Sequence, residues 1–418
     1  MGDHFPETVT ARPVAGSAPH SRRPGPATCI YAARALRDFG DGFVAVLLAV
    51  YLAELGLGAF EVGVVSTAAL LGSSLITLAI GVFAPPAGQR LLLLAASSLM
   101  FATGLAFAVA ESYAAILLVA LVGTINPTAG NVSIFVPMEH ALLAGVAPDV
   151  RRTRMFATYG LVGAFAAAVG SLVAGSPELL VALGWTKLAA LKAMFVVYAL
   201  LGLAGGAMYR VNPKGTVAAD ERPHFALGPS KKIVYRLAAL FSVDAFAGGF
   251  AVQSLMALWL FQTFGMSLAA AGMFFFWSGL LAAFSYPAAA WLAARIGLVN
   301  TMVWTHIPSS LCLIGAALVA DLHVALALLL ARSALSQMDV PARSSYVMAV
   351  VTPPERAAAA SVTSVPRGLA SAASPALAGA LFAAGWPAWP FIICGVLKIA
   401  YDLALLWSFR HVKPPEER

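Results

Sequence analysis

Nine ionisable side chains lie deep inside long apolar stretches of this 418-residue sequence. They are Asp38, Asp41, Asp244, Arg332, Asp339, Arg343, Arg367, Lys398 and Asp402. If those stretches cross a bilayer, each such charge costs about 2.5–3.5 kcal/mol when it faces lipid. Together they would exceed the stability of an ordinary fold, which is about 5–15 kcal/mol. We therefore expect these side chains to face a polar cavity or one another.

The spacing of four polar residues places them on one face of a helix. Arg332, Ser336, Asp339 and Arg343 stand at positions i, i+4, i+7 and i+11. On a continuous helix these positions form a single stripe. A polar stripe on an otherwise apolar helix indicates a cavity lining or a polar helix contact.

The deep carboxylates suit proton binding, and the deep arginines suit anion binding. A buried aspartate tends to take up a proton because burial penalises its charged form. Asp38, Asp41 and Asp244 are therefore candidates for a proton or cation site. A guanidinium stays charged and offers paired donors to a carboxylate, phosphate or oxyanion. Arg332 and Arg367 are therefore candidates for substrate binding.

Two pairs of opposite charge have a structural interpretation beside the functional one. Asp339 and Arg343 are four residues apart, so they could tie helices together or act as a gate that opens during transport. Lys398 and Asp402 have the same spacing, which favours a pair in which the two residues satisfy each other. We treat all four as gating or charge-pair candidates.

The first apolar stretch allows a similar alternative. Asp38 and Asp41 could pair with the nearby Arg34 and Arg37 instead of binding a proton. Arg34, Arg37 and Arg236 lie near helix ends, and we interpret them as topology and headgroup anchors.

Three other polar residues allow weaker hypotheses. Asn126 and Asn131 lie near a proline in the fourth stretch and could hydrogen-bond substrate or merely neighbouring backbone. His306 is followed closely by a proline, and we interpret it as a packing residue.

The elements that must position these residues are membrane-spanning helices. The chain is 60% hydrophobic and 11% charged, whereas a soluble domain is about 25% charged. This composition argues against a soluble enzyme or nucleic-acid-binding protein. A helix needs about 20 apolar residues to cross a bilayer. The sequence predicts twelve such helices, at 30–55, 62–83, 91–110, 113–144, 154–174, 188–209, 233–263, 268–293, 299–320, 322–351, 356–383 and 387–409.

The distribution of lysine and arginine predicts the orientation. With twelve spans, seventeen of these residues fall in tails and loops on the side of the termini, and only Lys187 falls on the other side. Cationic loops tend to remain cytoplasmic. We therefore expect both termini in the cytoplasm and the chain in the inner membrane, so that most of the net charge of +7 reflects topology.

The sequence gives no support for a cofactor, a metal site or catalysis. The three cysteines, Cys29, Cys312 and Cys394, are odd in number and far apart, which argues against a disulfide framework or a CxxC site. P-loop, HExxH, GxSxG and dinucleotide-binding patterns are absent from the sequence.

The two halves of the chain resemble each other. Residues 146–163 and 351–368 share a valine, a proline, an arginine, a threonine and a glycine at a constant offset of 205 residues. Two sets of six helices around a central polar segment are typical of transporters built from parallel repeats.

With these features the sequence resembles the major facilitator superfamily over nearly all of the chain beyond its N-terminal tail. The family's loop between helices 2 and 3 usually reads G-x-x-A-D-R-x-G-R-R. Here it keeps Gly81, Gly88 and Arg90 but has Pro85 at the acidic position, and the second copy keeps Arg295 and Gly297. The resemblance implies that these residues form a conformational loop motif, and that helices 1, 4, 7 and 10 line a central cavity.

The resemblance also implies an all-α membrane protein with twelve transmembrane helices, arranged as two six-helix bundles related by a parallel pseudo-two-fold repeat. The family default is a monomer. The expected division is a disordered cytoplasmic tail at 1–28, an N-terminal bundle at 29–209, a cytoplasmic linker at 210–232, a C-terminal bundle at 233–410 and a tail at 411–418.

The expected function is secondary active transport of a small anionic or zwitterionic solute by alternating access. We expect proton coupling, and efflux is favoured because it is common in the family. The expected partners are the solute, protons and membrane lipids; nucleic acid is not expected. Two alternatives stay open. The same fold could carry an inorganic ion, metal or metalloid, or it could serve as a membrane sensor or assembly factor, to which the altered loop motif gives some weight.

Overall fold

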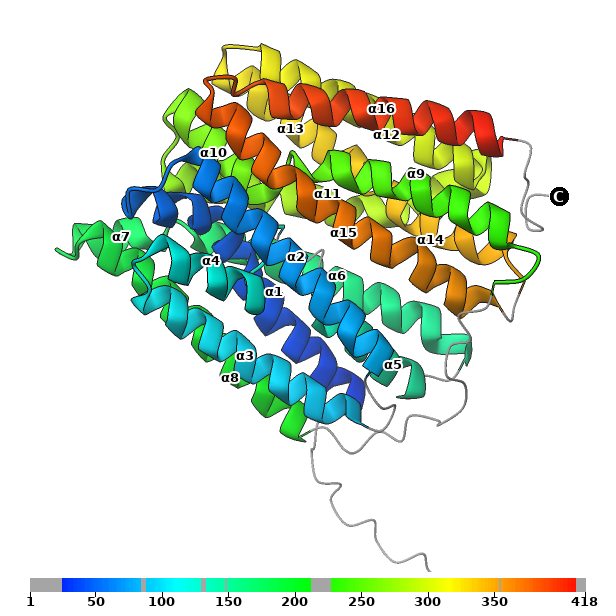
Figure 1. Ribbon diagram of the computed structural model, residues 1–418, viewed down its shortest axis with the longest axis horizontal. Helices are drawn as coiled ribbons and strands as arrows, with labels where there is room; N and C mark the ends of the chain where they lie inside the picture. Colours follow the sequence, from blue (N-terminus) through cyan, green and yellow to red (C-terminus); the bar gives the residue numbers. More distant parts are fainter. Residues whose placement is uncertain are drawn as a thin grey trace, which may run out of the picture.

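The computed structural model describes residues 25–83, 88–128, 133–146, 149–211, 227–352 and 355–410, and these form sixteen α-helices (Figure 1). The helices of the first half are α1 (Pro26–Glu54), α2 (Ala59–Phe83), α3 (Gln89–Val109), α4 (Tyr113–Val122), α5 (Phe135–Val146), α6 (Asp149–Val173), α7 (Ser176–Ala182) and α8 (Lys187–Val211). Those of the second half are α9 (Lys231–Gly249), α10 (Gln253–Phe264), α11 (Leu268–Ile296), α12 (Leu298–Leu318), α13 (Leu322–Ser336), α14 (Asp339–Val350), α15 (Arg356–Ala383) and α16 (Trp389–Phe409).

These helices make twelve passages through the molecule, as the sequence predicts. Within the described ranges, nine segments are long and apolar enough to span a membrane by themselves. The other three passages are α1, which carries several charges, the interrupted pair α4 and α5, and α15, which has a polar face. Charges and breaks weaken the apolar character of these three passages.

Three helices that the sequence predicts as continuous are interrupted. The predicted helix at 113–144 is divided into α4 and α5, the one at 233–263 into α9 and α10, and the one at 322–351 into α13 and α14. Proline explains two of the breaks, because it lacks the N–H that continues a helix: Pro127 lies in the first, and Pro341 in the first turn of α14. The third break follows the flexible pair Gly248-Gly249.

The two ends of the molecule differ. We call the end that carries the start of α1 and the end of α16 the terminal face, and the end that carries the short helix α7 the distal face (Figure 1). Within the first half, α1 packs on α6 and α8, and α3 packs on α8; within the second half, α12 packs on α13 and α16, and α9 on α15 and α16. The halves meet where α2 packs on α15 and α6 packs on α11.

Glycines allow the α2–α15 contact. A Cβ atom on Gly63 would lie 2.4 Å from the carbonyl oxygen of Pro375, and one on Gly379 would lie 2.6 Å from that of Ala59. Small residues at such positions let helix backbones approach closely inside a membrane. The distal parts of the two halves are therefore in direct backbone contact.

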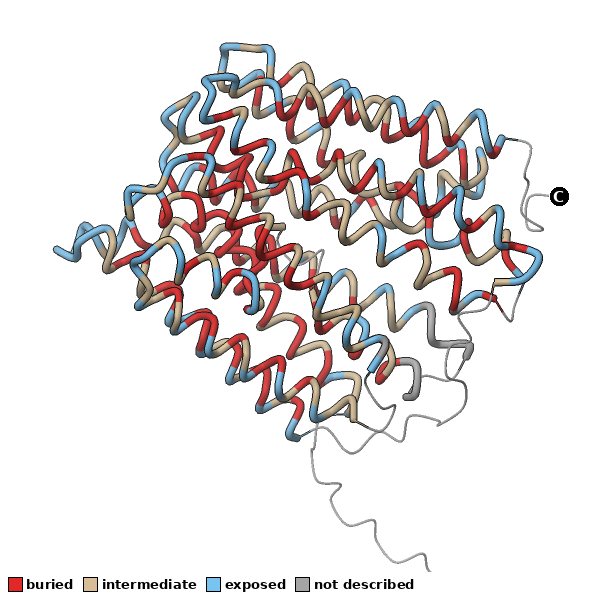
Figure 2. The backbone as a smooth tube through the Cα atoms, in the orientation of Figure 1, coloured by how far each residue is buried: buried red, intermediate tan, exposed pale blue. Residues whose placement is uncertain are grey.

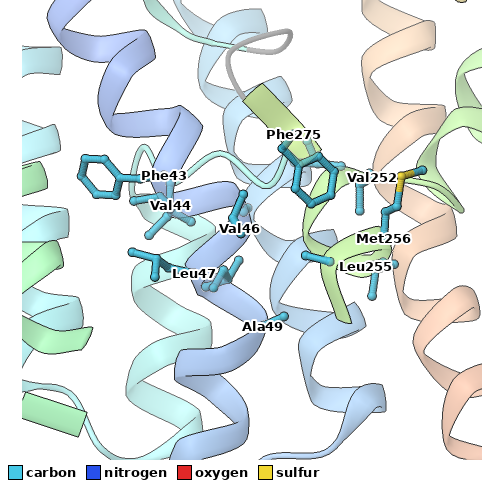
Figure 3. Close-up of a cluster of buried hydrophobic side chains, with 14 of the residues drawn as sticks. Phe43, Val44, Val46, Leu47, Ala49, Val252, Leu255, Met256 and Phe275 are labelled. Carbon is cyan, nitrogen blue, oxygen red and sulfur yellow. The ribbon is translucent and has the colours of Figure 1, made fainter. Parts of the chain in front are cut away.

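An apolar core joins the halves on the same side. Phe43, Val44 and Leu47 of α1 belong to one buried cluster with Leu255 of α10 and Phe275 of α11 (Figure 3). Figure 2 shows buried positions gathered along the inner faces of the helices and toward the distal face. This packing closes the distal side of the space between the halves.

A carboxylate joins the starts of two helices at the terminal face. Glu355, just before α15, accepts hydrogen bonds from the Ser230 hydroxyl at 2.6 Å, from the Thr352 hydroxyl at 2.5 Å and from the backbone N–H of Gly228. The hydroxyl hydrogen bonds are the main reason why the pKa of Glu355 is lowered from 4.5 to about 2. Glu355 thus fixes the start of α9 against the start of α15.

This carboxylate predicts a pH dependence of stability. Because folding lowers the pKa of Glu355, its contribution is present above pH 4.5 and is lost as the pH falls toward 2. We expect Glu355→Gln to lower the thermal unfolding temperature at pH 7 and to narrow its difference from the native protein near pH 2–3. Unfolding scans in detergent between pH 2.5 and 7 measure this, and equal differences at all pH values would contradict it.

Candidate functional site in the central cavity

A cavity of about 530 Å³ lies between the two halves. All of its charged or titratable lining residues belong to the second half, namely Asp244, Tyr286, His306, Arg332, Arg367 and Lys398. The lining from the described part of α1–α8 is uncharged and includes the hydroxyls of Ser74, Thr77, Thr128 and Ser133. The cavity is therefore charged on one side and neutral but hydrogen-bonding on the other.

Hydrogen bonds between the halves lie toward the distal face. Ser66 binds Ser254 across the gap at 3.1 Å, and Gln253 donates to Ser171 at 3.2 Å. Further out, the Glu178 carboxylate accepts the backbone N–H of Leu268 at 2.8 Å. Toward the terminal face the halves diverge (Figure 1). We infer that the cavity is reached from the terminal face.

Arg332 and Arg367 are two cations that have no partner among the described residues. Their guanidinium groups form no hydrogen bond or ion pair with any residue that the structure describes, and Nε of Arg367 is buried without a hydrogen-bond partner. Arg332 lies near the middle of the passage formed by α13 and α14, and Arg367 lies near the middle of α15. The sequence predicts both as substrate-binding residues, and the structure brings both to the cavity wall.

Asp244 is the centre of a charged network in the second half. Its carboxylate contacts Nζ of Lys398 at 2.6 Å and a guanidinium nitrogen of Arg343 at 3.2 Å. Arg343 also binds Asp339 at 2.9 Å, so the predicted pair of these two residues is present. The break before α14 divides the predicted polar stripe: Arg332 lines the cavity, whereas Arg343 turns to Asp244.

The predicted pair of Lys398 with Asp402 is wrong. Lys398 contacts Asp244, and Asp402 contacts Nδ1 of His306 at 3.1 Å. The same imidazole places Nε2 3.2 Å from Nζ of Lys398. The interpretation of His306 as a packing residue is therefore also wrong, because its ring from α12 joins two charged residues of α16.

A second network is enclosed within the first half. Arg37 binds Glu139 through two hydrogen bonds of 3.0 and 2.9 Å, and the hydroxyls of Tyr159 and Tyr209 donate to the same carboxylate at 2.5 Å each. The interpretation of Arg34 and Arg37 as headgroup anchors is therefore wrong, because both are buried and Arg34 donates to the Tyr159 hydroxyl at 3.1 Å. Arg236 is exposed, as an anchor requires.

The two aspartates of α1 have different surroundings. Asp38 lies 2.6 Å from Nε of Arg34 and 3.4 Å from Nε of Arg37. Among the described residues, Asp41 accepts hydrogen bonds from neutral donors, the Tyr198 hydroxyl at 3.3 Å and Nδ2 of Asn126 at 3.4 Å. Both aspartates are almost fully buried and neither lines the cavity. Asp38 thus belongs to the ion-pair network, while Asp41 lies at its neutral edge.

Glu139 is the residue of this network that sequence reasoning missed. It lies within the stretch predicted as the fourth helix, where any carboxylate is expensive. If Glu139 is counted among the deep charges, the first half contains a buried carboxylate that can pair with Arg37.

The remaining predicted residues have mixed outcomes. Asn126 binds Asp41 and also accepts the backbone N–H of Thr128 at 2.9 Å, which stabilises the break after α4. Asn131 lies outside the described residues. These contacts fit the interpretation of Asn126 as a residue that hydrogen-bonds neighbouring backbone, and its role as a substrate ligand stays a prediction.

The loop motif is only partly described, because residues 84–87 fall outside the described ranges. Gly81 lies in α2 and Gly88 caps α3. Arg90 donates to the Tyr209 carbonyl at 3.1 Å, which ties α3 to the end of α8. In the second copy, the Arg295 guanidinium lies 4.0 Å from the Trp291 ring centre, and Gly297 has a φ of 86°, which favours glycine.

The family is decided by a comparison with family models. Residues 30–336 and 238–418 each match the model of the major facilitator superfamily. The chain belongs to the major facilitator superfamily. As a superfamily member it is a secondary transporter and not an enzyme, and it crosses the membrane several times.

Known superfamily members support the fold over almost the whole length. An uncharacterized membrane protein of Saccharomyces cerevisiae is 23% identical, over 91% of this chain and 93% of its own. A bacterial homologue of the human lysosomal transporter Spinster, in an inward-facing and unoccupied conformation, has a TM-score of 0.68 at 14% identity, over 94% of this chain and 96% of that chain. A human organic anion transporter has a TM-score of 0.62 at 16% identity, over 93% and 100%. Identities this low carry the fold alone.

Proposed function

We propose that this transporter carries a small organic anion across the cytoplasmic membrane. One observation supports the proposal above all: Arg332 and Arg367 face the cavity without any partner in the described part of the protein. An unpaired buried cation is costly, and a carboxylate or phosphate offers it charge-assisted hydrogen bonds. The solved relative that is named as an organic anion transporter fits the same proposal.

The neutral wall suggests what the rest of the solute is like. Hydroxyl groups of Ser74, Thr77, Thr128 and Ser133 face the charged side across the cavity. Hydroxyls both donate and accept hydrogen bonds. They suit a solute whose anionic group lies against the second half and whose body carries hydroxyls or other neutral polar groups. Asp244 could in addition hold an amino group, so a zwitterion is included in the proposal.

The orientation that we propose places both termini in the cytoplasm. The positive-inside bias of the loops supports it. The distal face, which is closed by the contacts of Ser66, Gln253 and Glu178, would then face outward. The cavity would open to the cytoplasm, and rocking of the halves would close the terminal face during transport.

Charge balance supports Asp41 as the proton-binding carboxylate. The buried network of the first half contains two cations, Arg34 and Arg37, and three carboxylates, Asp38, Asp41 and Glu139. Glu139 and Asp38 both contact an arginine, so the uncompensated charge falls on Asp41, whose contacts are neutral. One bound proton at Asp41 makes the network neutral, which favours a proton there over the other two carboxylates.

Replacing Asp41 tests this assignment. Asp41→Asn mimics the protonated form, so we expect solute exchange to continue while fewer protons move with each solute than in the native protein. Proteoliposomes containing a pH-sensitive dye measure the proton movement, and counterflow of labelled solute measures the exchange. Asp38→Asn is the matched comparison, because it removes an ion-paired carboxylate on the same helix. A ratio of protons to solute in Asp41→Asn equal to that of the native protein would contradict the assignment.

The proposed substrate class is tested with purified protein in liposomes. Gluconate, lactate and glycerol 3-phosphate are the anionic probes, glucose and glycerol are their neutral counterparts, and sulfate represents an inorganic oxyanion. We expect counterflow with at least one organic anion and none with the neutral counterparts. Transport of sulfate alone would favour the inorganic-ion alternative, and transport of the neutral solutes in preference to the anions would overturn the proposal. An imposed pH gradient in the same vesicles gives the direction.

A further inference from the structure

His306 lies between a buried carboxylate and a cavity lysine. Its Nδ1 is 3.1 Å from Oδ1 of Asp402, and its Nε2 is 3.2 Å from Nζ of Lys398. Nε2 is also 3.9 Å from Oδ1 of Asp244, the carboxylate that Lys398 contacts. His306 and Lys398 both line the cavity, although the imidazole is only 4% exposed.

These contacts define the protonation state of the imidazole in this conformation. The ammonium group of Lys398 can only donate hydrogen bonds, so Nε2 must accept. The ring proton is therefore on Nδ1, where it is donated to Asp402, and His306 is neutral. A proton added to Nε2 would point an N–H at an ammonium group 3.2 Å away. The Lys398 contact and a protonated His306 therefore exclude each other.

We propose that His306 is a proton-binding switch that releases Lys398 to the substrate anion. In the proton-free state Lys398 is held by His306 and Asp244. When Nε2 binds a proton, the new N–H turns to Oδ1 of Asp244, and Lys398 moves into the cavity as a third cation beside Arg332 and Arg367. The inference rests on the proposed function, because it needs an anion at those two arginines.

The surrounding charges couple the proton to the anion. With His306 neutral, the described interior of the second half contains four cations and three carboxylates, so positive charge is in excess. The cations are Arg332 of α13, Arg343 of α14, Arg367 of α15 and Lys398 of α16. The carboxylates are Asp244 of α9, Asp339 of α14 and Asp402 of α16, and the neutral Tyr401 hydroxyl lies beside them. A proton alone would increase the excess of positive charge, and an anion alone would find one cation fewer. Each ligand therefore favours binding of the other, and this coupling is reciprocal.

The coupling is measured with gluconate, whose carboxylate stays ionised at neutral pH. We expect its Kd to fall as the pH is lowered from 8 to 6, by at most about tenfold per pH unit for one linked proton. In His306→Gln the Kd should change clearly less over this range than in the native protein. His323→Gln is the control, because His323 is 93% exposed and remote from the cavity lining. Its pH dependence should equal that of the native protein. A pH dependence in His306→Gln as large as that of the native protein would overturn the switch.

A ligand-free measurement keeps the inference separate from the proposed function. Nitrogen NMR of histidine-labelled protein in detergent reports the protonation of each imidazole. The signal that is lost in His306→Gln belongs to His306. If that variant does not fold, His306→Asn, which keeps an amide near Asp402, identifies the signal instead. We expect His306 to change from the Nδ1–H form to the doubly protonated form when the pH is lowered. If gluconate does not bind, only the proposed function is contradicted. If the His306 signal does not change with pH, only the switch is contradicted.

Discussion

Arg332→Gln and Arg367→Gln are each expected to abolish most anion transport while leaving the protein folded. A hydrogen bond to a charged group contributes about 1.5–3 kcal/mol, so the loss of one guanidinium should weaken anion binding about 10- to 150-fold. Neither guanidinium has a described partner in the protein, so its removal leaves no buried carboxylate unpaired. This separates the two arginines from Arg343, whose loss would expose Asp339 and Asp244.

The measurement is a Kd or counterflow rate for an anion of the panel, together with a thermal unfolding scan. Arg→Lys at each position should retain part of the binding, because the charge remains but the paired donors are lost. Arg236→Gln is the matched control, since Arg236 is exposed away from the cavity and its removal should change neither quantity. An unchanged Kd in both cavity variants would contradict the proposal that these arginines bind the anion. A large fall in unfolding temperature would indicate that they have a structural role instead.

The sequence could predict which residues are polar inside the membrane but not which of them meet. Helical spacing gives contacts over one turn, so the pair of Asp339 and Arg343 was correct. The same rule failed for Lys398 and Asp402, because an imidazole from another helix lies within reach of both. The local rule supplies geometry but carries no information about competing partners from distant segments.

The important partners are remote in sequence. Arg37 and Glu139 are 102 residues apart, and Asp244 and Lys398 are 154 apart. Their pairing depends on which helices become neighbours, and apolar periodicity alone leaves that undetermined. The twelve passages were predictable because each needs about 20 apolar residues. The breaks were only partly predictable. Proline marks two of them in the sequence, but tertiary contacts such as that of Asn126 with Asp41 are needed to satisfy the polar groups there.

The two halves therefore use their charges differently. The first half closes its network on itself around Glu139, out of contact with the cavity. The second half exposes part of its network to the cavity through Asp244, His306 and Lys398. Sequence repetition predicts two similar bundles, yet this division of roles arises from residues that the repeat does not share. A stability experiment on the first half and a binding experiment on the second half should accordingly give different results.

Arg37→Gln is expected to give the largest loss of stability of any single change proposed for this protein. Removing one partner of a buried ion pair costs about 3–5 kcal/mol, because the other charge stays buried and uncompensated. Arg37 contacts both Glu139 and Asp38, and Arg34 would be the only remaining described cation of the network. The apparent unfolding temperature and the unfolding free energy in a denaturing-detergent titration measure the loss.

The double variant Arg37→Gln with Glu139→Gln distinguishes this cause from a general packing defect. It removes one charge of each sign, so the network regains its original balance, and replacement of both partners is often nearly neutral. We expect the double variant to be more stable than Arg37→Gln, with an interaction energy that a double-mutant cycle extracts. The exposed pair of Lys187 and Glu54, 3.0 Å apart, is the control cycle and should give about 0.2–1 kcal/mol. If both cycles gave the same small energy, Arg37 and Glu139 would contribute no more than a surface pair, and the charge balance that assigns the proton to Asp41 would lose its basis.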